Sequence, residues 1–229
     1  MNTFVAVCAG VLLGAGTAGA QARIDAPWRV GISLGARFHA DSSVDAFASG
    51  RSQFASGLSL SRDVATFRER GTVAVDLDWS METLDGGFGQ AFHTRLSAHA
   101  LTAGLSVRWH VARWFEPYAR ASVGAGYSDL ALTPQASSNA SALAGDAWTL
   151  LGTAGAGVQL TTGTFLRRAR FVFAVEAGGV FAMSQTMRVA PDAAHPGSTP
   201  ADALPVGATT LGGLNLGGGY FKMLVGLRF

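Results

Sequence analysis

The sequence has few charges, one cysteine, one lysine and no long apolar run outside its beginning. Charged residues make up 14% of its 229 residues, against about 25% in ordinary soluble domains. After the first two dozen residues there is no run of about 18 apolar residues, so the sequence offers no transmembrane helix there. A closed barrel is the other way to pair every backbone group inside lipid, so a β-barrel is the membrane architecture that remains.

The scarce residue types also exclude several classes of function. Cys8 lies in the N-terminal apolar stretch, so the rest of the chain has neither disulfides nor thiol chemistry. Sixteen arginines and one lysine against fifteen acids give a net charge of +2, which is too balanced to indicate a nucleic-acid-binding protein. The five histidines lack metal-ligand spacing, and no phosphate-loop residues follow Gly217-Gly218-Gly219. We therefore expect no metal site and no cofactor.

The N-terminus has the pattern of a secretory signal peptide. Phe4 to Leu13 form a short apolar core, and small residues follow with two A-x-A cleavage sites that end at Ala20 and Ala22. The pattern lacks a basic residue before the core. We expect residues 1–22 to be removed and residues 23–229 to form one domain.

Alternation of apolar with small or polar residues is the dominant pattern after residue 27. From Trp28 to Phe38, every second residue is apolar, and such runs of about ten residues are typical of tilted transmembrane strands. The same alternation predicts eight strands, at residues 28–38, 54–60, 71–81, 96–110, 117–130, 148–160 and 171–187, and in a last segment that ends at Phe229.

Long and short connections alternate between these segments. Residues 39–52, 82–94, 133–146 and 189–213 are polar or Gly-rich and are predicted to be long loops, whereas residues 62–70 are predicted to be a turn. The connections after the fourth and sixth strands are short and Arg-rich. In outer-membrane barrels short turns face the periplasm and long loops face the exterior.

The polar rows of the predicted strands carry charges of both signs. An eight-stranded barrel has an interior only wide enough for side chains, so we expect these charges to pair and fill it. Glu176 and Lys222 are expected to meet in the middle, within about 4 Å of each other. The predicted interior network comprises Arg37, Asp76, Asp78, Arg108, Arg120, Glu176 and Lys222, together with Tyr118 and Gln159.

The last sixteen residues, LNLGGGYFKMLVGLRF, alternate most regularly and end on an aromatic residue. This stretch resembles the C-terminal strand of bacterial outer-membrane β-barrels, and the whole chain resembles the OmpA-like family of eight-stranded barrels in pattern and terminus. The row that would be recognised by the barrel assembly machinery is Phe221, Met223, Val225, Leu227 and Phe229.

This resemblance implies an all-β fold, a closed antiparallel up-and-down transmembrane barrel of eight strands. It also implies a place in the outer membrane of a Gram-negative bacterium, with both termini on the periplasmic side. The expected partners are outer-membrane lipids and the assembly machinery, and a monomer is expected.

Three classes of function follow from this architecture. The first is a structural or surface-interaction barrel without enzymatic activity, whose loops present polar residues outside. The second is a small porin-like channel. The third is a lipid-modifying enzyme, for which His93, Ser97 and His99 with Glu82 are the candidate residues.

Overall fold

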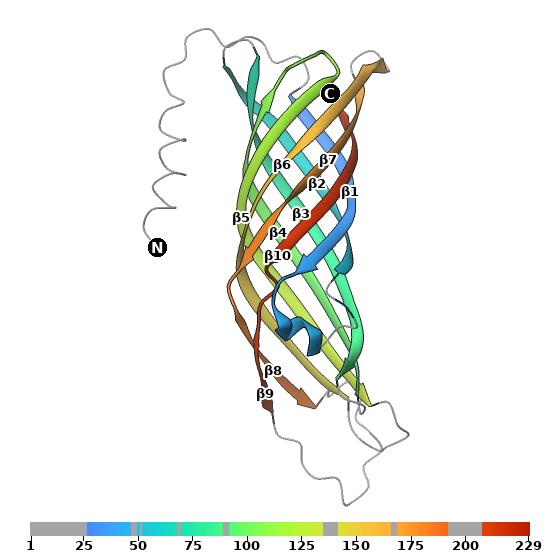
Figure 1. The fold of residues 1–229 in the computed structure, drawn as a ribbon, viewed down its shortest axis with the longest axis vertical. Coiled ribbons are helices and arrows are strands. Elements are labelled where there is room, and N and C mark those ends of the chain that lie inside the picture. The colour runs from blue at the N-terminus through green and yellow to red at the C-terminus, as the bar shows by residue number, and fades with distance from the viewer. Residues whose placement is uncertain are drawn as a thin grey trace, which may run out of the picture.

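A computed structural model shows an all-β chain in which every strand pairing is antiparallel (Figure 1). It describes residues 27–46, 50, 52–67, 70–88, 92–134, 142–165, 169–191 and 208–229. The predicted signal peptide, residues 1–22, lies outside these residues. Within them, no helix is long and apolar enough to cross a membrane.

Ten strands form one sheet, and eight of them pair in a closed ring. The ring order is β1-β2-β3-β4-β5-β6-β7-β10, and β10 pairs back onto β1. The elements are β1 (Trp28–His39), η2 (Ser42–Ala46), β2 (Ser52–Phe67), β3 (Gly71–Phe88), β4 (Phe92–Trp109), β5 (Phe115–Pro134), β6 (Leu143–Phe165), β7 (Ala169–Ala182), β8 (Gln185–Pro191), β9 (Thr209–Leu214) and β10 (Gly218–Arg228).

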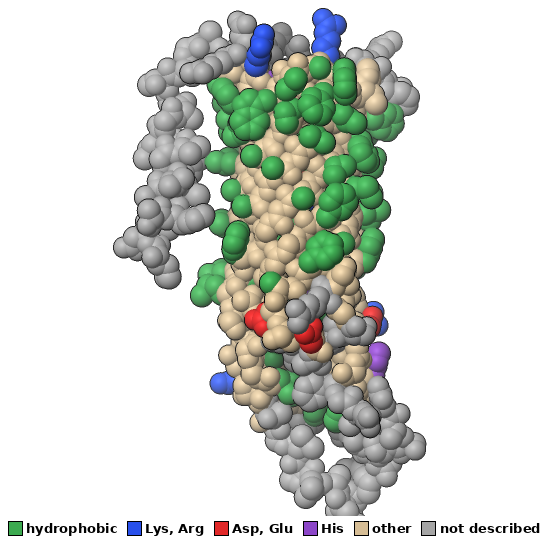
Figure 2. Space-filling model, in the orientation of Figure 1, with side chains coloured by type: hydrophobic (Ala, Val, Ile, Leu, Met, Phe, Trp, Pro, Cys, Tyr) green, Lys and Arg blue, Asp and Glu red, His purple; other side chains and the backbone are tan. Residues whose placement is uncertain are grey.

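The two rows of each ring strand have opposite surroundings. Apolar residues of the outward row are exposed, as Ile32 at 58% and Trp148 at 69% show, whereas Asp76 and Arg108 of the inward row are 0% exposed. Apolar side chains cover the wall of the ring between its ends, and charged side chains appear near the ends (Figure 2). This arrangement reverses that of a soluble protein, in which apolar side chains are inside and charged ones are mostly exposed.

One end of the ring holds the start of β1 and the end of β10, and we call it the terminal end. Trp28 and Phe229 are joined there by two backbone hydrogen bonds, of 3.0 and 2.9 Å. The far end carries η2, β8 and β9 (Figure 1).

The far end contains an apolar core inside the ring. Inward-facing leucines of β3, β4 and β5 meet Val44 of η2, Met187 of β8 and Leu214 of β9, all at most 1% exposed. The far end is therefore filled by apolar side chains, whereas charged side chains fill the rest of the ring. The buried members are Val44, Leu84, Leu96, Ala98, Leu130, Leu132, Met187, Val189, Leu214 and Leu216.

Several predicted boundaries are wrong because the strands are longer than their alternation shows. The predicted turn at 62–70 is largely strand, since β2 continues to Phe67. A register shift between Asp63 and Ala65 breaks the alternation there. The predicted loop at 82–94 is also mostly strand, because β3 and β4 pair as far as Phe88 and Phe92. In the predicted loop at 133–146, β5 extends to Pro134 and β6 begins at Leu143.

The prediction of eight strands is met only in part, because eight strands form the ring but the sheet contains ten strands in the described residues. The predicted strand 171–187 ends at Ala182, and the chain restarts as β8, which pairs with β9 and meets β6 only at Leu143 and Ala144. The predicted loop 189–213 therefore holds parts of two strands. Both are short, at seven and six residues, and their glycine and proline content weakens any strand pattern in the sequence.

Candidate functional site

Among the residues that the structure describes, twelve charged side chains point into the ring, six cations and six carboxylates. Each lies within 4 Å of at least one opposite charge. All of them are 16% exposed or less, so they are shielded from solvent and pair with each other. The cations are Arg29, Arg37, Arg108, Arg120, Lys222 and Arg228, and the carboxylates are Asp63, Asp76, Asp78, Glu82, Glu116 and Glu176.

Glu176 of β7 is the centre of one group, which we call the central cluster. Its carboxylate accepts hydrogen bonds from Tyr118 Oη at 2.8 Å and from Tyr220 Oη at 2.5 Å. It also accepts one from Arg120 Nη2 at 3.1 Å. Four strands, β5, β7, β10 and β3, supply the cluster, so its bonds tie distant parts of the ring together.

The predicted pair of Glu176 and Lys222 lies in this cluster. The two residues are direct partners in the pairing of β7 with β10, and Lys222 Nζ lies 3.5 Å from Glu176 Oε1, within the expected distance. Lys222 Nζ also lies 3.6 Å from Asp78 Oδ1, and Arg120 Nη1 donates to Asp78 Oδ2 at 2.5 Å. The two positive charges of Lys222 and Arg120 thus neutralise the two negative charges of Glu176 and Asp78.

Glycines of β6 and β7 provide the space for the two tyrosines. A Cβ added at Gly155 would lie 2.2 Å from Tyr220 Oη, and one added at Gly157 would lie 2.9 Å from Tyr118 Oη. These contacts are too close for any side chain. The inward glycines of β6 are therefore part of the site, because they let both phenol groups reach Glu176.

A second group, the terminal-end cluster, is built around Arg108 of β4. Arg108 Nη1 donates to Asp63 Oδ1 at 2.7 Å, and Nη2 donates to Ser61 Oγ at 2.5 Å and lies 3.9 Å from Asp76 Oδ1. Asp76 in turn lies 3.4 Å from Arg29 Nη2. A guanidinium that is 0% exposed is thus shared among neighbouring polar groups.

Glu116 and Arg228 complete this cluster. Arg228 Nη2 donates to Asp63 Oδ2 at 2.8 Å, and its Nη1 donates to Glu116 Oε1 at 3.2 Å. Gln159 Nε2 donates to the other oxygen of Glu116 at 3.0 Å and its Oε1 accepts from Arg29. The terminal end is therefore closed by a continuous set of ion pairs and hydrogen bonds.

The third group, the far pair, consists of Arg37 and Glu82. Arg37 Nη1 donates to Glu82 Oε1 at 2.7 Å, and its Nη2 donates to the carbonyl of Leu216 at 3.1 Å. His39 Nε2 lies 3.4 Å from Glu82 Oε2, and its side chain is 0% exposed. The far pair lies next to the apolar core, because Leu216 belongs to that core.

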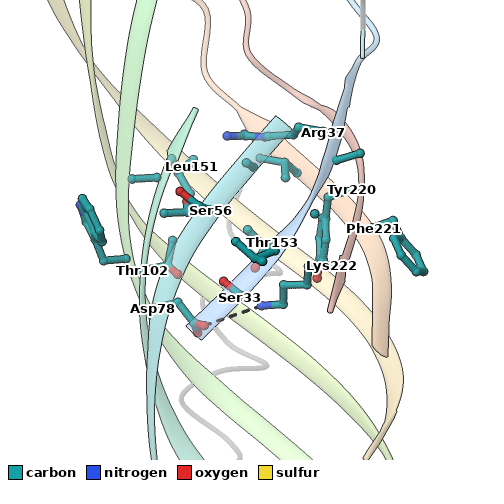
Figure 3. A pocket seen from close by; sticks show the side chains of 18 of the residues that line it. Ser33, Arg37, Ser56, Asp78, Thr102, Leu151, Thr153, Tyr220, Phe221 and Lys222 are labelled. Carbon is teal, nitrogen blue, oxygen red and sulfur yellow. Dashed lines mark ion pairs between the residues drawn. The ribbon is translucent and has the colours of Figure 1, made fainter. Parts of the chain in front are cut away.

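A cavity of about 90 Å³ lies between the far pair and the central cluster. Figure 3 shows Arg37 on one side of it and Asp78 with Lys222 on the other, with Ser33 and Thr153 on the wall. A water molecule needs roughly 10–15 Å³ of such space. The cavity therefore has room for several water molecules among polar groups, but not for a large solute.

The structure places every predicted interior residue inside the ring and distributes these residues over the three groups. Sequence analysis missed Arg29, Asp63, Glu116, Tyr220 and Arg228 as members of the network, and it assigned Glu82 to a loop. Arg29, Tyr220 and Arg228 belong to the polar rows of their strands, so the alternation itself could have identified them. Asp63 was assigned to the predicted turn at 62–70, although it continues the inward row of Ser59 and Ser61.

The candidate enzyme residues do not converge. His93 and His99 are exposed, and the ring of His99 is stacked on Trp79 with centroids 6.0 Å apart. Glu82 is 3% exposed and is bound to Arg37 inside the ring. The carboxylate therefore lies on the opposite face of the sheet from the histidines. Among the described residues, no group of three potential metal ligands is present.

The proposed assembly row lies on the outside of β10. The exposed fractions of its members run from 37% for Leu227 to 57% for Val225. Residues of the other row, such as Lys222 and Leu224, face the interior. Phe221, Met223, Val225, Leu227 and Phe229 thus form one continuous apolar strip.

No family model matches the chain, and no curated protein matches it. The crystal structure of a major outer membrane protein from Thermus thermophilus is similar with a TM-score of 0.49 and 12% identity, and the match covers 88% of this chain and 98% of that one. The transport unit of the autotransporter AIDA-I from Escherichia coli gives a TM-score of 0.34 and 9% identity over 98% and 97% of the two chains. Since both TM-scores are below 0.5, the architecture of this chain rests on its own strand pairing and burial.

Proposed function

We propose that this chain is an outer-membrane β-barrel protein with a structural or surface-interaction role. The observation that carries the proposal is the reversed burial of the ring, with exposed apolar side chains outside and paired charges inside. In water this arrangement would leave large apolar areas exposed and would bury many charges at a cost. In a lipid bilayer the same apolar side chains would contact acyl chains instead of water.

The height of the apolar wall supports this proposal. From Trp28 to Phe38 the outward row of β1 is apolar over ten residue steps, which at about 3.3 Å per step is ~33 Å along the strand. With the ~40° tilt of barrel strands, the height along the barrel axis is ~25 Å. That value equals the height of the apolar band in outer-membrane barrels, about 25 Å.

The closed interior supports a structural role over transport. Four groups follow one another along the axis of the ring: the terminal-end cluster, the central cluster, the far pair and the apolar core. Each is held by contacts between residues of different elements. Strands β5 and β6 contain 20 and 23 residues, about twice the 9–11 needed to cross a bilayer. We propose that their far ends stand outside the membrane as a rigid surface, with both termini on the periplasmic side.

The test is to express the full chain in a Gram-negative host, separate the membranes and run the protein unboiled and boiled on a detergent gel. A barrel in the outer membrane is expected in that fraction and is expected to migrate differently after boiling. A protein recovered in the periplasmic fraction, with the same mobility in both lanes, would refute the proposal.

A channel is the second candidate function, and the cavity beside Lys222 is the observation that favours it. The packed groups on both sides of the cavity lead us to expect no steady conductance when the purified protein is inserted into planar bilayers. A reproducible conductance step with each insertion would instead establish an open path and make transport the better proposal.

A further inference from the structure

The exposed charges of the described residues differ between the two ends of the ring. Arg62, Arg70, Arg113 and Arg170 are exposed at the terminal end, and no exposed Asp or Glu side chain accompanies them among the residues that the structure describes there. The far end is mixed. Its exposed charges include Asp45, Asp85, Asp129, Asp146, Arg95 and Arg188.

These four arginines differ from those of the interior, each of which is paired. None of the four has an ion pair with a carboxylate of the described ranges, whereas Arg108, Arg120 and all other interior cations do. The chain therefore balances its buried charges and leaves these terminal-end cations exposed. We call the four residues the arginine rim.

Aromatic side chains surround the arginine rim. The guanidinium carbon of Arg62 lies 5.0 Å from the centroid of the Trp28 ring, and Arg62 and Trp28 are direct partners in the pairing of β1 with β2. Arg113 precedes Trp114, which is 60% exposed. The aromatic residues exposed at this end are Trp28, Phe67, Trp109, Trp114, Phe171 and Phe229.

Exposed arginines surrounded by aromatic side chains are suited to bind lipid headgroups at the edge of a membrane. Tryptophan is typically found at the level of the lipid headgroups, so Trp28 would hold the guanidinium of Arg62 at that level. A guanidinium offers paired N–H donors that match the oxygens of a phosphate. Unpaired arginines at this level are therefore suited to phosphate groups and to the negative charge of an anionic lipid.

We propose that the arginine rim binds the headgroups of anionic phospholipids in the leaflet that surrounds the terminal end. This inference rests on the proposed membrane-spanning barrel, and it adds a lipid class to it. The rim contacts the phosphate and the net negative charge of the headgroup, and the aromatic residues contact the first carbons of the acyl chains. Zwitterionic lipids offer the same phosphate without the net charge, so they bind less well.

The test compares two brominated lipids as quenchers of tryptophan fluorescence in vesicles. The protein carries Trp79→Phe and Trp148→Phe, so that the three remaining tryptophans, Trp28, Trp109 and Trp114, all lie at the terminal end. Brominated phosphatidylglycerol is expected to displace unbrominated lipid from these sites roughly fivefold better than brominated phosphatidylcholine at low salt. Raising the salt concentration to about 0.5 M should reduce this preference, because the charges become screened.

The variant for the rim replaces all four arginines by glutamine, and its matched control is Arg95→Gln with Arg188→Gln at the far end. The rim variant is expected to lose the preference and the control to keep it. Equal quenching by both lipids in the parent protein, or the same preference in the rim variant, would overturn the inference. If the rim variant does not fold, a preference in the parent protein that salt leaves unchanged overturns it.

Failure of the barrel proposal gives a different result. A chain that does not enter vesicles shows no quenching by either lipid and no heat-dependent mobility. A chain that shows both quenching and heat-dependent mobility, but no lipid preference, would support the barrel proposal and contradict lipid binding by the arginine rim.

Discussion

Replacing Glu176 and Lys222 singly and together tests whether the interior charges act as a balanced set. Glu176→Gln leaves two cations, Arg120 and Lys222, with Asp78 as the one carboxylate of the described residues within 4 Å of them. Lys222→Met leaves Arg120 alone between two carboxylates. The double variant removes one charge of each sign and leaves the ion pair between Arg120 and Asp78.

The separations give the size of the expected effect. Lys222 Nζ lies 3.5 Å from Glu176 and 3.6 Å from Asp78, and at an effective dielectric constant of about 20 each contact amounts to ~5 kcal/mol before the cost of desolvation. Loss of one partner of a buried ion pair typically costs about 3–5 kcal/mol. We expect each single variant to lose that much stability and the double variant to lose at least ~2 kcal/mol less than the sum of the two.

The measurement is urea unfolding of the protein refolded into lipid vesicles, followed by tryptophan fluorescence, with the gel-mobility shift as a count of folded molecules. The control pair is Arg95→Met and Asp146→Asn, two exposed charges at the far end, which should each change the free energy of unfolding by less than about 0.5 kcal/mol. If the effects of the two interior replacements simply add, Glu176 and Lys222 are not coupled, and the balanced cluster is the wrong explanation of this interior.

Two further replacements test the packing and the proposed solvent. Gly155→Ala would place a Cβ 2.2 Å from Tyr220 Oη, so we expect the free energy of unfolding in urea to fall by about 1–3 kcal/mol. The control is Gly163→Ala on the same strand, whose Cβ would meet nothing within 4 Å and which should leave the stability unchanged. Equal effects of the two replacements would contradict the contact with Tyr220. Ile32→Arg, in the apolar wall, should lower the free energy of unfolding in vesicles by about 2–4 kcal/mol. The control Thr133→Arg, beyond that wall, should lower it far less. An Ile32→Arg protein as stable as this control would show that lipid does not surround β1.

Alternation was sufficient to sort the residues of the ring strands into two rows. Because successive side chains of a strand point to opposite faces, Asp76, Asp78 and Glu176 fall in the row opposite to their apolar neighbours, and the expected barrel then placed that row inside. The pair of Glu176 and Lys222 could be predicted for a second reason. The two strands pair without a register shift from the terminal end, where Arg170 is opposite Arg228, so residues at equal distance along the two strands are partners.

The missed parts are those in which the alternation is interrupted or carries no charge. In β2, Asp63 still belongs to the inward row, but an extra residue directly after it interrupts the alternation, so residues 62–70 were predicted to be a turn and Asp63 was missed with them. At the far end the inward row becomes apolar, as at Leu84 and Leu130. The outward row is polar there, as at Asp85 and Asp129. The alternation is therefore inverted relative to the rest of the ring, and these stretches were predicted to be loops.

The charged interior also defines which register each strand adopts. An apolar interior would leave both rows of a strand suited to lipid, so a slip by one residue would cost little. With Asp76 and Glu176 in the inward row, the same slip would turn a carboxylate into the lipid and an apolar side chain such as Leu77 into the packed interior. In the proposed membrane, a wrong register would therefore expose charge to lipid and break the ion pairs of several other strands together. The free-energy cost of burying twelve charges is offset by their pairing. Because this pairing forms in one register only, the charges favour one alignment of the eight ring strands.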